Sequence, residues 1–564
     1  MDFVGISLLL VTSAIFGVLA KFAKQPLLVG YLFAGATASY FGLLTDHGLV
    51  EALGKIGVTL LLFLVGLEMN LKDLPTVGKT ALVTGVGQIA FTLLFGFILS
   101  SFLGFSTISS LYIGAAMAFS STIIIIKLFS EKKVLDSLYG KISVGFLLVQ
   151  DLVAVLVLMF LAGLKEDGFG VGPILLMVFK AVLVFAATWY LSKKILPLIF
   201  ERIVGHSTEL LFIVSIAWAL GVSSLMGGPL GFSFEIGGFL AGLALSNIPE
   251  HLGVASRTKP LRDFFLTIFF LSLGSQLLVG DISSVIVPSI FLSLLVIIGN
   301  PIIVMSMLGI LGYKKRTSFF SSVAVAQISE FSFILMAMGL SLGHVTSEAV
   351  STVILVGAIT MTLSTYLILG SEKIFKKIQN FISFFERRKT NESAYTQEVD
   401  FSEHVVLVGC DKIGSSMLSY FRRRNIPLVV IDFDPGVFKR LSSENTSVLL
   451  GDATDSEILE LAKITSAKLI ICTIPNVEEN LSILETIKSS KNKPIYIGSA
   501  QSREDSVRVY EAGADYVLNP DIIAGEFLRH IFLHHGFSVN KISKMGKNHF
   551  NRLMYLKPNA KTKI

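Results

Sequence analysis

Charged residues are scarce in this chain, and their scarcity excludes an ordinary soluble protein. Only 16% of the 564 residues are Asp, Glu, Lys or Arg, whereas 52% are hydrophobic, and the mean hydropathy is +0.72. Soluble globular domains carry about 25% charged residues. Much of the chain is therefore expected to lie in lipid.

Cysteine is almost absent as well. Cys410 and Cys472 lie in apolar runs of the C-terminal third, without the spacing of a metal site. This usage excludes a disulfide-rich secreted fold and fits a reducing compartment. The net charge of +6 does not indicate a nucleic-acid partner, because the cations cluster in short connections between apolar runs.

Long apolar runs are confined to residues 1–371, which we expect to form a polytopic all-α membrane domain. A helix needs roughly 17–25 apolar residues to cross a bilayer, and runs of that length predict about thirteen spans. The predicted spans are 3–20, 26–44, 54–70, 77–103, 108–129, 138–164, 172–196, 208–226, 232–247, 262–279, 283–311, 317–341 and 347–370. The first run has no basic segment before it, so it is interpreted as a spanning helix and not as a signal peptide.

Lysines and arginines follow alternate connections between these runs. Examples are Lys21 with Lys24, Lys132 with Lys133, and the cluster at 314–316. The positive-inside rule makes these connections cytoplasmic. The N-terminus is then outside and the C-terminus inside, which an odd number of spans also requires. We expect a multi-pass protein of the inner or plasma membrane.

One carboxylate lies near the centre of the sixth predicted span. It is Asp151, with Gln150 beside it and apolar residues around the pair. Ionisable groups inside spans are costly and mark ion pathways. Because a low-dielectric site disfavours the charged form, a proton and a cation compete for this group. Asp151 is thus the predicted monovalent-cation and proton site of an exchanger, the alternative being a structural Asp bonded to a neighbouring helix.

Polar breaks interrupt two other predicted spans. The fifth span contains Ser121 and Thr122, and the twelfth contains Gln327 and Glu330. Such residues satisfy the backbone of an unwound helix and lend oxygens to a cation, although serines in membrane helices also serve packing alone. Inverted-repeat transporters carry broken helices at corresponding positions of their two halves. The two breaks are seven spans apart, as two six-helix units with a linker helix require.

These segments belong to an ordered set of short motifs. The set is PLLVGYLFAG (26–35), GVTLLLFLVGLE (57–68), FSSTI (119–123), Gln150-Asp151, GGFLAG (237–242), FFLSLG (269–274) and QISEF (327–331). In this order the sequence resembles the cation:proton antiporter-2 family, and within it the Kef-type potassium efflux antiporters. The resemblance extends over roughly residues 5–520, by the order of these segments along the chain.

The resemblance implies an inverted-repeat sodium/proton exchanger fold. In that fold a core domain moves against a dimerisation domain, the two broken helices cross at their unwound midpoints, and Asp151 is the shared ion and proton site. A homodimer through both the membrane and the cytoplasmic domains is implied, and an ancillary subunit is left open. The Gln150-Asp151 pair resembles the potassium-linked branch, with Na+ as the alternative cation.

Two positions depart from the family pattern. Many relatives place a lysine midway along the eleventh span, where this chain has Asn300. A neutral residue beside a single carboxylate favours electroneutral, one-for-one exchange. The glutathione-gated members have an acidic connection after the ninth span, whereas the connection at 251–260 is basic here. Glutathione gating is therefore not predicted.

Residues 403–520 are expected to form a C-terminal α/β Rossmann-like domain. It follows a polar cytoplasmic linker at 372–402 and precedes a helical, then basic tail at 521–564. Predicted strands at 404–410, 427–433, 447–451 and 468–474 alternate with predicted helices, which indicates a parallel doubly wound sheet. The domain resembles the RCK N-terminal (TrkA-N) domain and is expected to regulate transport.

The first turn of this domain resembles a dinucleotide-binding loop with one exception. Asp411 occupies the middle position of the G-x-G-x-x-G pattern, where a glycine lets the backbone approach the pyrophosphate. AMP or another adenine nucleotide is therefore favoured over NAD(H), the alternative being a fold used only for dimerisation. The candidate binding residues are Gly409, Asp411, Gly414, Asp432, Asp452 and Thr473.

Two rival functions lack sequence support. A gated potassium channel needs a carbonyl-lined filter on a TVGYG loop between two spans, which the sequence does not contain, and about thirteen spans with a mid-membrane Asp favour alternating access. A membrane-anchored oxidoreductase would use two thirds of the chain as an anchor. The prediction is a secondary active transporter and not an enzyme.

Overall fold

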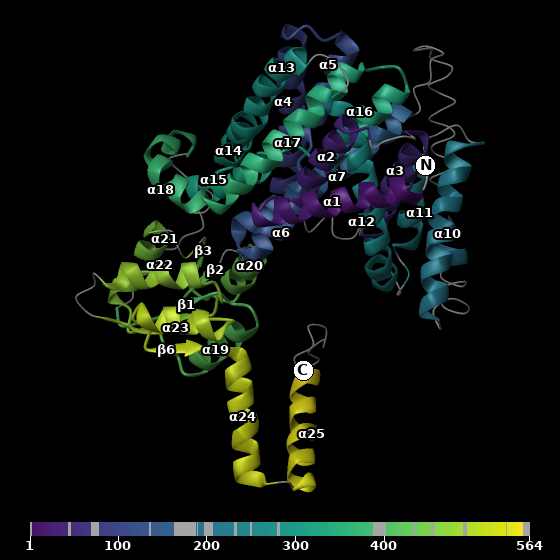
Figure 1. Cartoon of the computed structure of the whole chain (residues 1–564). Coiled ribbons are helices and arrows are strands. Elements are labelled where there is room, and N and C mark those ends of the chain that lie inside the picture. Colours follow the sequence, from purple (N-terminus) through teal and green to yellow (C-terminus); the bar gives the residue numbers. More distant parts are fainter. Residues whose placement is uncertain are drawn as a thin grey trace. The chain divides into compact units, whose positions relative to one another are not determined.

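The computed structural model of the chain (Figure 1) separates into two compact units, Met1–Asn391 and Glu392–Ile564, which we describe separately. The residues that it describes are 3–42, 47–68, 78–132, 134, 137–162, 188, 190–196, 207–229, 234–246, 248, 251–278, 282–386, 402–432, 435–451, 453, 456–488, 493–536 and 538–555.

The first unit is helical, because long apolar runs can satisfy their backbone in lipid only within a helix. Its elements up to residue 245 are α1 (Phe3–Phe22), α2 (Leu27–Tyr40), α3 (His47–Glu68), α4 (Gly78–Phe102), α5 (Thr107–Ala118), α6 (Thr122–Glu131), α7 (Leu138–Ala162), η1 (Leu191–Ile195), α10 (Thr208–Gly227) and α11 (Phe234–Leu245). The remaining elements are α12 (His251–Ser275), η3 (Gln276–Leu278), α13 (Ile282–Leu294), η4 (Leu295–Gly299), α14 (Asn300–Ile310), α15 (Lys315–Ser322), η5 (Val323–Val325), α16 (Glu330–Ser341), α17 (Ser347–Leu369), α18 (Ser371–Ile382) and η6 (Ser383–Phe385).

The helices of this unit have the length and the apolar surface of a membrane domain. Within the described residues, eight helical spans are long and apolar enough to cross a membrane, and three shorter apolar helices accompany them. Large apolar side chains face outward, including Val11 (55% exposed), Leu82 (55%) and Ile298 (52%). The predicted total of about thirteen spans stays a prediction, because the segment 172–196 lies largely outside the described residues.

One predicted boundary is wrong. The basic segment 251–260 is expected to be a connection, but α12 already begins at His251 and carries Pro260 in its interior. Four of its ten residues, one each of Leu, Ala, Arg and Lys, favour helix. A membrane helix tolerates a proline when neighbouring groups compensate for the lost backbone hydrogen bond. The helix therefore extends beyond the apolar span into this charged segment.

Two helix crossings are related by an internal symmetry. A Cβ atom added to Gly35 of α2 would meet the Leu271 carbonyl of α12, and one added to Gly274 of α12 would meet the Leu32 carbonyl of α2. The α11 and α3 helices repeat this arrangement: a Cβ on Gly242 would meet the Phe63 carbonyl. Small residues allow such close approach of helices in membranes.

The pairing of helices follows the same repeat. α1 packs on α2 as α10 packs on α11, α2 on α12 as α11 on α3, and α4 on α7 as α13 on α17. Two six-helix units with equivalent contacts are the pattern of an inverted-repeat transporter. The motifs at 26–35, 57–68, 237–242 and 269–274 thus lie at the helix crossings of this scaffold.

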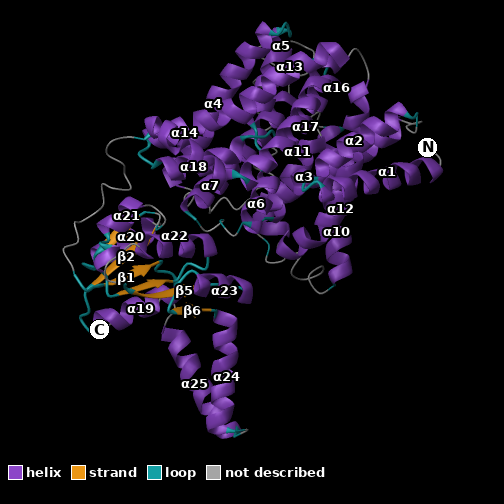
Figure 2. Ribbon diagram, turned by 60° about the vertical axis from the view of Figure 1, so that its left-hand side comes forward, coloured by secondary structure: helices purple, strands orange, loops and turns teal. Residues whose placement is uncertain are grey.

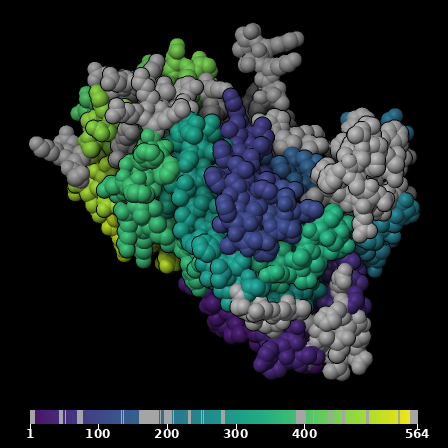
Figure 3. All heavy atoms as spheres, turned by 90° about the horizontal axis from the view of Figure 1, so that it is seen from above, coloured from purple at the N-terminus to yellow at the C-terminus, as the bar shows by residue number. Residues whose placement is uncertain are grey.

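A second group of helices surrounds the two polar breaks. α4 contacts α5, α7 and α14, and α16 contacts α5 and α17. Figure 3 shows residues of α4 and α5 between those of α13 and α14 on one side and α16 and α17 on the other. This group holds all of the membrane residues predicted to bind the ion.

The second unit is a doubly wound sheet (Figure 2). Its six parallel strands lie in the order β3-β2-β1-β4-β5-β6. The strands are β1 (Val405–Val408), β2 (Leu428–Asp432), β3 (Val448–Leu450), β4 (Leu469–Cys472), β5 (Ile495–Ser499) and β6 (Tyr516–Leu518). The helices are α19 (Lys412–Arg423), α20 (Pro435–Ser443), α21 (Ser456–Leu461), η7 (Ile464–Ser466), α22 (Val477–Lys488), α23 (Arg503–Glu511), α24 (Pro520–His535) and α25 (Val539–Tyr555).

Both faces of this sheet are covered, as its continuous apolar strands require. Val406 and Val408 pack with residues of α21, α22 and α23. Val405 and Leu407 point to the opposite face, where α19 and α20 cover them. The register pairs Val408 with Ile431 and with Cys472, so the carboxyl ends of β1, β2 and β4 meet at one edge.

Candidate ion site and nucleotide loop

The fifth predicted span is broken at its hydroxyl residues, as predicted. α5 ends at Ala118, Phe119 is extended (φ −92°, ψ 135°), and Ser121 caps the new helix α6 by accepting a hydrogen bond from the Ile124 amide. Serine favours this position because its side-chain oxygen satisfies an amide left free by the first turn. Ser121 is fully buried, so the break lies inside the protein.

The twelfth predicted span is broken in the same way. α15 continues into the short 3-10 segment η5, and α16 begins only at Glu330. Ser329 caps α16 and forms a capping box with Ser332. The Glu330 carboxylate, in the first turn, accepts a hydrogen bond from the Ser329 hydroxyl (3.2 Å) and complements the positive helix end.

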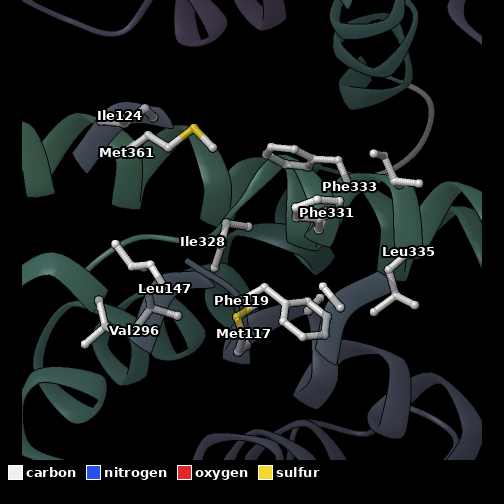
Figure 4. Close-up of a cluster of buried hydrophobic side chains, with 14 of the residues drawn as sticks. Met117, Phe119, Ile124, Leu147, Val296, Ile328, Phe331, Phe333, Leu335 and Met361 are labelled. Carbon is white, nitrogen blue, oxygen red and sulfur yellow. The ribbon is translucent and has the colours of Figure 1, made fainter. Parts of the chain in front are cut away.

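The two breaks meet. Gln327 donates from Nε2 to the Ser121 carbonyl (3.5 Å), and the Ser332 hydroxyl donates to the Ala116 carbonyl (2.6 Å). Ser364 of α17 donates to the Gln327 side-chain oxygen (2.7 Å). Figure 4 shows Met117, Phe119 and Ile328 of the breaks among buried apolar side chains, which keep bulk water away from these polar contacts.

Asn300 ties the breaks together from a third helix. Its Nδ2 donates to the Met117 carbonyl at the end of α5 (3.1 Å) and to the Val325 carbonyl at the end of η5 (3.5 Å). Carbonyl groups at a helix C-terminus carry partial negative charge. Asn300 therefore satisfies both helix ends with a neutral amide, after a π-helical turn, η4, that precedes it.

Asp151 lies on α7 beside this region. The side chains of Glu330 and Thr122 lie close enough to its carboxylate to interact with it electrostatically. The Thr122 hydroxyl does not meet the geometry of a hydrogen bond. Asp151 is partly exposed, whereas Gln150 is 1% exposed. The structure thus brings Asp151, Thr122 and Glu330 together, and Ser121 and Gln327 adjoin them through the crossing.

Sequence analysis missed two polar residues of α4. Gln150 reaches Asn300 only through Gln88 and Thr92, which are both fully buried. Their signal was a pair of hydrogen-bonding residues four positions apart, on one face of an otherwise apolar helix. In lipid such a pair requires partners, and here it has them.

The predicted nucleotide loop adopts a Rossmann-type turn after β1. Gly409 has a φ of +83°, and a Cβ atom there would lie 2.8 Å from the Thr473 hydroxyl oxygen. Thr473 donates to the Val408 and Gly409 carbonyls (3.1 and 3.0 Å). A Cβ on Gly414 would clash with the Gly409 carbonyl. Both glycines are therefore required by the turn itself.

The acidic candidates are placed differently from one another. The Asp432 carboxylate, 7% exposed, accepts a hydrogen bond from the Cys410 amide (2.7 Å). Asp411 is exposed at the start of α19 and makes no capping bond. Asp452 lies outside the described residues.

The two cysteines are structural in character. Burial raises the pKa of the Cys410 thiol, and burial raises the pKa of Cys472 to about 12. Both thiols therefore stay protonated at neutral pH and unreactive. Among the described residues, no cluster of three His, Cys, Asp or Glu side chains offers a metal site.

Two broken helices that meet beside a membrane carboxylate define a secondary transporter and not an enzyme. The comparisons name its family: the chain belongs to the sodium/hydrogen exchanger family, whose transmembrane profile matches residues 8–369. The TrkA-N domain profile matches residues 405–520. The resemblance to Kef-type cation/proton antiporters is thereby confirmed.

Similar proteins agree with this assignment. The chain is 33% identical to the putative cation/proton antiporter YbaL of Escherichia coli over 90% of this chain and 93% of that protein. It is 25% identical to the putative K(+) efflux antiporter KefB of Alkalimonas amylolytica, over 90% and 77%. The sodium proton antiporter MjNhaP1 of Methanocaldococcus jannaschii shares the fold (TM-score 0.50, 18% identity, 68% of this chain and 98% of that chain).

Proposed function

We propose that this protein exchanges potassium for protons, one for one, by alternating access at Asp151. The observation that carries the proposal is the position of Asp151, a partly exposed residue of α7, beside Thr122 and Glu330 at the starts of the two broken helices. Potassium is favoured by the relatives named as K(+) efflux antiporters. Sodium is the alternative, since both ions take carboxylate and hydroxyl oxygens.

The mechanism follows from competition at one group. With a cation bound, Asp151 is ionised and its charge is balanced. When the cation leaves, a proton takes its place, because an uncompensated carboxylate at membrane depth is costly. Glu330 is held at the start of α16 by Ser329, and Asn300 brings no charge. One titrating group accounts for an electroneutral cycle.

Transport in proteoliposomes tests this mechanism. A trapped pH-sensitive dye should report proton movement when K+ is added, and the steady-state pH difference should not change under an imposed membrane potential. Asp151→Asn, which keeps the size but cannot ionise, should reduce the rate to that of empty liposomes. Asp263→Asn is the matched control, because Asp263 is a surface carboxylate paired with Arg262 (2.7 Å).

The outcomes separate the alternatives. Exchange driven by Na+ and not by K+ would reverse the selectivity. A steady-state pH difference that changes with the imposed potential would contradict the one-for-one stoichiometry. Coupled exchange that survives Asp151→Asn would overturn the proposed site.

The remaining proposals concern organisation. We assign transport to residues 1–371, a linker to 372–402, regulation to 403–520 and a tail to 521–564. The protein is proposed to lie in the inner or plasma membrane, with its N-terminus outside and its second unit in the cytoplasm.

Regulation is proposed to use AMP or another adenine nucleotide rather than NAD(H). The chain is proposed to be a homodimer through both units, which mass photometry of the purified protein should show as twice 61.3 kDa.

One surface supports the dimer. α24 exposes a series of large apolar side chains, and water-exposed apolar groups in such number mark an interaction site. The residues are Ile522 (47% exposed), Phe527 (59%), Leu528 (55%), Phe532 (46%) and Leu533 (75%). A second copy that covers these side chains is the occupant we propose.

A further inference from the structure

A chain of side-chain hydrogen bonds crosses the membrane unit from α7 to the two broken helices. Gln150 Nε2 donates to Gln88 Oε1 (2.5 Å), and Gln88 Nε2 donates to the Thr92 hydroxyl (3.0 Å). The Thr92 hydroxyl donates to Asn300 Oδ1 (2.7 Å). Asn300 Nδ2 then donates to the two helix-end carbonyls, of Met117 and Val325.

The direction of this chain is fixed at its far end. A backbone carbonyl can only accept a hydrogen bond, so Asn300 must turn its NH2 group to Met117 and Val325 and its oxygen to Thr92. Thr92 must then donate to Asn300, and its oxygen accepts from the NH2 group of Gln88. The oxygen of Gln88 is left to accept from Gln150. The far carbonyls thus determine the orientation of every amide back to α7.

Gln150 is consequently left with one free group, its side-chain oxygen. This Oε1 atom is buried and has no hydrogen-bond partner in the described part of the chain. A buried amide oxygen without a partner is unfavourable, and Gln150 itself is only 1% exposed. The series of hydrogen bonds therefore leaves a free acceptor oxygen on the residue that precedes Asp151 in the sequence.

We propose that Gln88 and Thr92 are positioning residues for the cation. They hold the Gln150 amide so that its oxygen, and not its NH2 group, is offered to a cation bound at Asp151. A carbonyl oxygen is a ligand for such an ion, whereas an NH2 group would repel it. They also connect this ligand to the ends of α5 and η5. The inference rests on the proposed exchange at Asp151.

Substitutions at Thr92 test the chain directly. Thr92→Val keeps the shape but removes the hydroxyl, so Asn300 Oδ1 and Gln88 Nε2 each lose a partner and Gln150 loses its fixed orientation. The apparent KM for K+ should rise about tenfold, the ratio that one hydrogen-bond-sized free energy gives. The maximal rate and the pH midpoint at saturating K+ should stay near those of the wild type, because Asp151 is intact.

Three further variants serve as controls. Thr92→Ser retains the hydroxyl and should restore the wild-type KM. Gln88→Met fills a similar volume without an amide and should raise the KM as Thr92→Val does. Thr84→Val changes a buried hydroxyl of the same helix that has no hydrogen-bond partner in the described structure, and should leave the KM unchanged.

The readouts distinguish the two proposals. If the wild type shows no exchange, or if Asp151→Asn retains it, the proposed function fails. If the wild type exchanges but Gln88→Met and a folded Thr92→Val keep the wild-type KM, the positioning role is overturned. K+-dependent thermal stabilisation gives a second measurement, since a ligand of the folded state raises its stability; the increase should be smaller in both variants, and an undiminished increase would also overturn the role.

Discussion

At the scale of single residues, polar groups at membrane depth carry the information that sequence analysis can use. Asp151, Ser121 and Glu330 were recognised because an ionisable or hydroxyl residue in an apolar run demands a reason. Gln88 and Thr92 were missed because an amide and a hydroxyl alone are common packing devices. Their meaning depends on Asn300, 208 residues beyond Thr92, and sequence spacing cannot supply a contact of that range.

His404 gives a prediction on pH. It is fully buried at the start of β1, and its Nε2 lies 2.8 Å from the Ala462 carbonyl. Burial lowers the pKa of His404, against the smaller effect of the Ala462 bond. The unfolded chain, with a histidine pKa of about 6.5, therefore binds more protons at acid pH. The stability contributed by neutral His404 is full above that pH and is lost as the pH falls below it.

The expected loss has a maximum slope of about 1.4 kcal/mol per pH unit, because one proton is involved. Calorimetry of the purified protein at pH 7.5, 6.5 and 5.5 should show the transition of the second unit falling more steeply in the wild type than in His404→Gln. Equal pH dependence of the two proteins would contradict the assignment.

At the scale of elements, the sequence predicts types better than ends. The break positions and the alternation of strands and helices were correct, because hydroxyl residues and apolar periodicity are local signals. The predicted start of α12 is wrong, because charged residues end the apolar part of a span and not the helix, which begins at His251. The two last strands, β5 and β6, were not assigned, and they are short or partly polar.

The glycine crossings give a prediction for the scaffold. Gly242→Ala places a Cβ atom against the Phe63 carbonyl, so α11 and α3 must separate. We expect a destabilisation of about 1–3 kcal/mol, as for overpacked cores, read as a lower unfolding temperature in detergent. Gly221→Ala on α10 is the control, because nothing lies within 4 Å of its added Cβ atom. A Gly242→Ala protein as stable as Gly221→Ala would show that the crossing is adaptable.

At the scale of the whole molecule, a transporter is joined to a TrkA-N domain. Its ligand is undetermined by the turn geometry, because Gly409 and Gly414 are conformationally required whatever binds. The proposed preference for a mononucleotide rests instead on Asp411. A carboxylate at the middle position of the loop adds bulk and negative charge where a pyrophosphate would lie, which disfavours NAD(H) more than a mononucleotide.

This yields a prediction for ligand choice. In the full-length protein, AMP at a hundredfold excess over its Kd should stabilise the folded second unit by about 2.7 kcal/mol, seen as a rise of several degrees in its transition, whereas NAD should have a smaller effect. Asp411→Gly should increase the NAD effect. Asp411→Asn removes the charge but keeps the size of the side chain. An NAD effect between those of the wild type and Asp411→Gly would show that charge repulsion and steric bulk both weaken NAD binding. If neither AMP, ATP, NAD nor NADH shifts the transition, the proposed nucleotide sensing is overturned, and a fold used for dimerisation is the alternative.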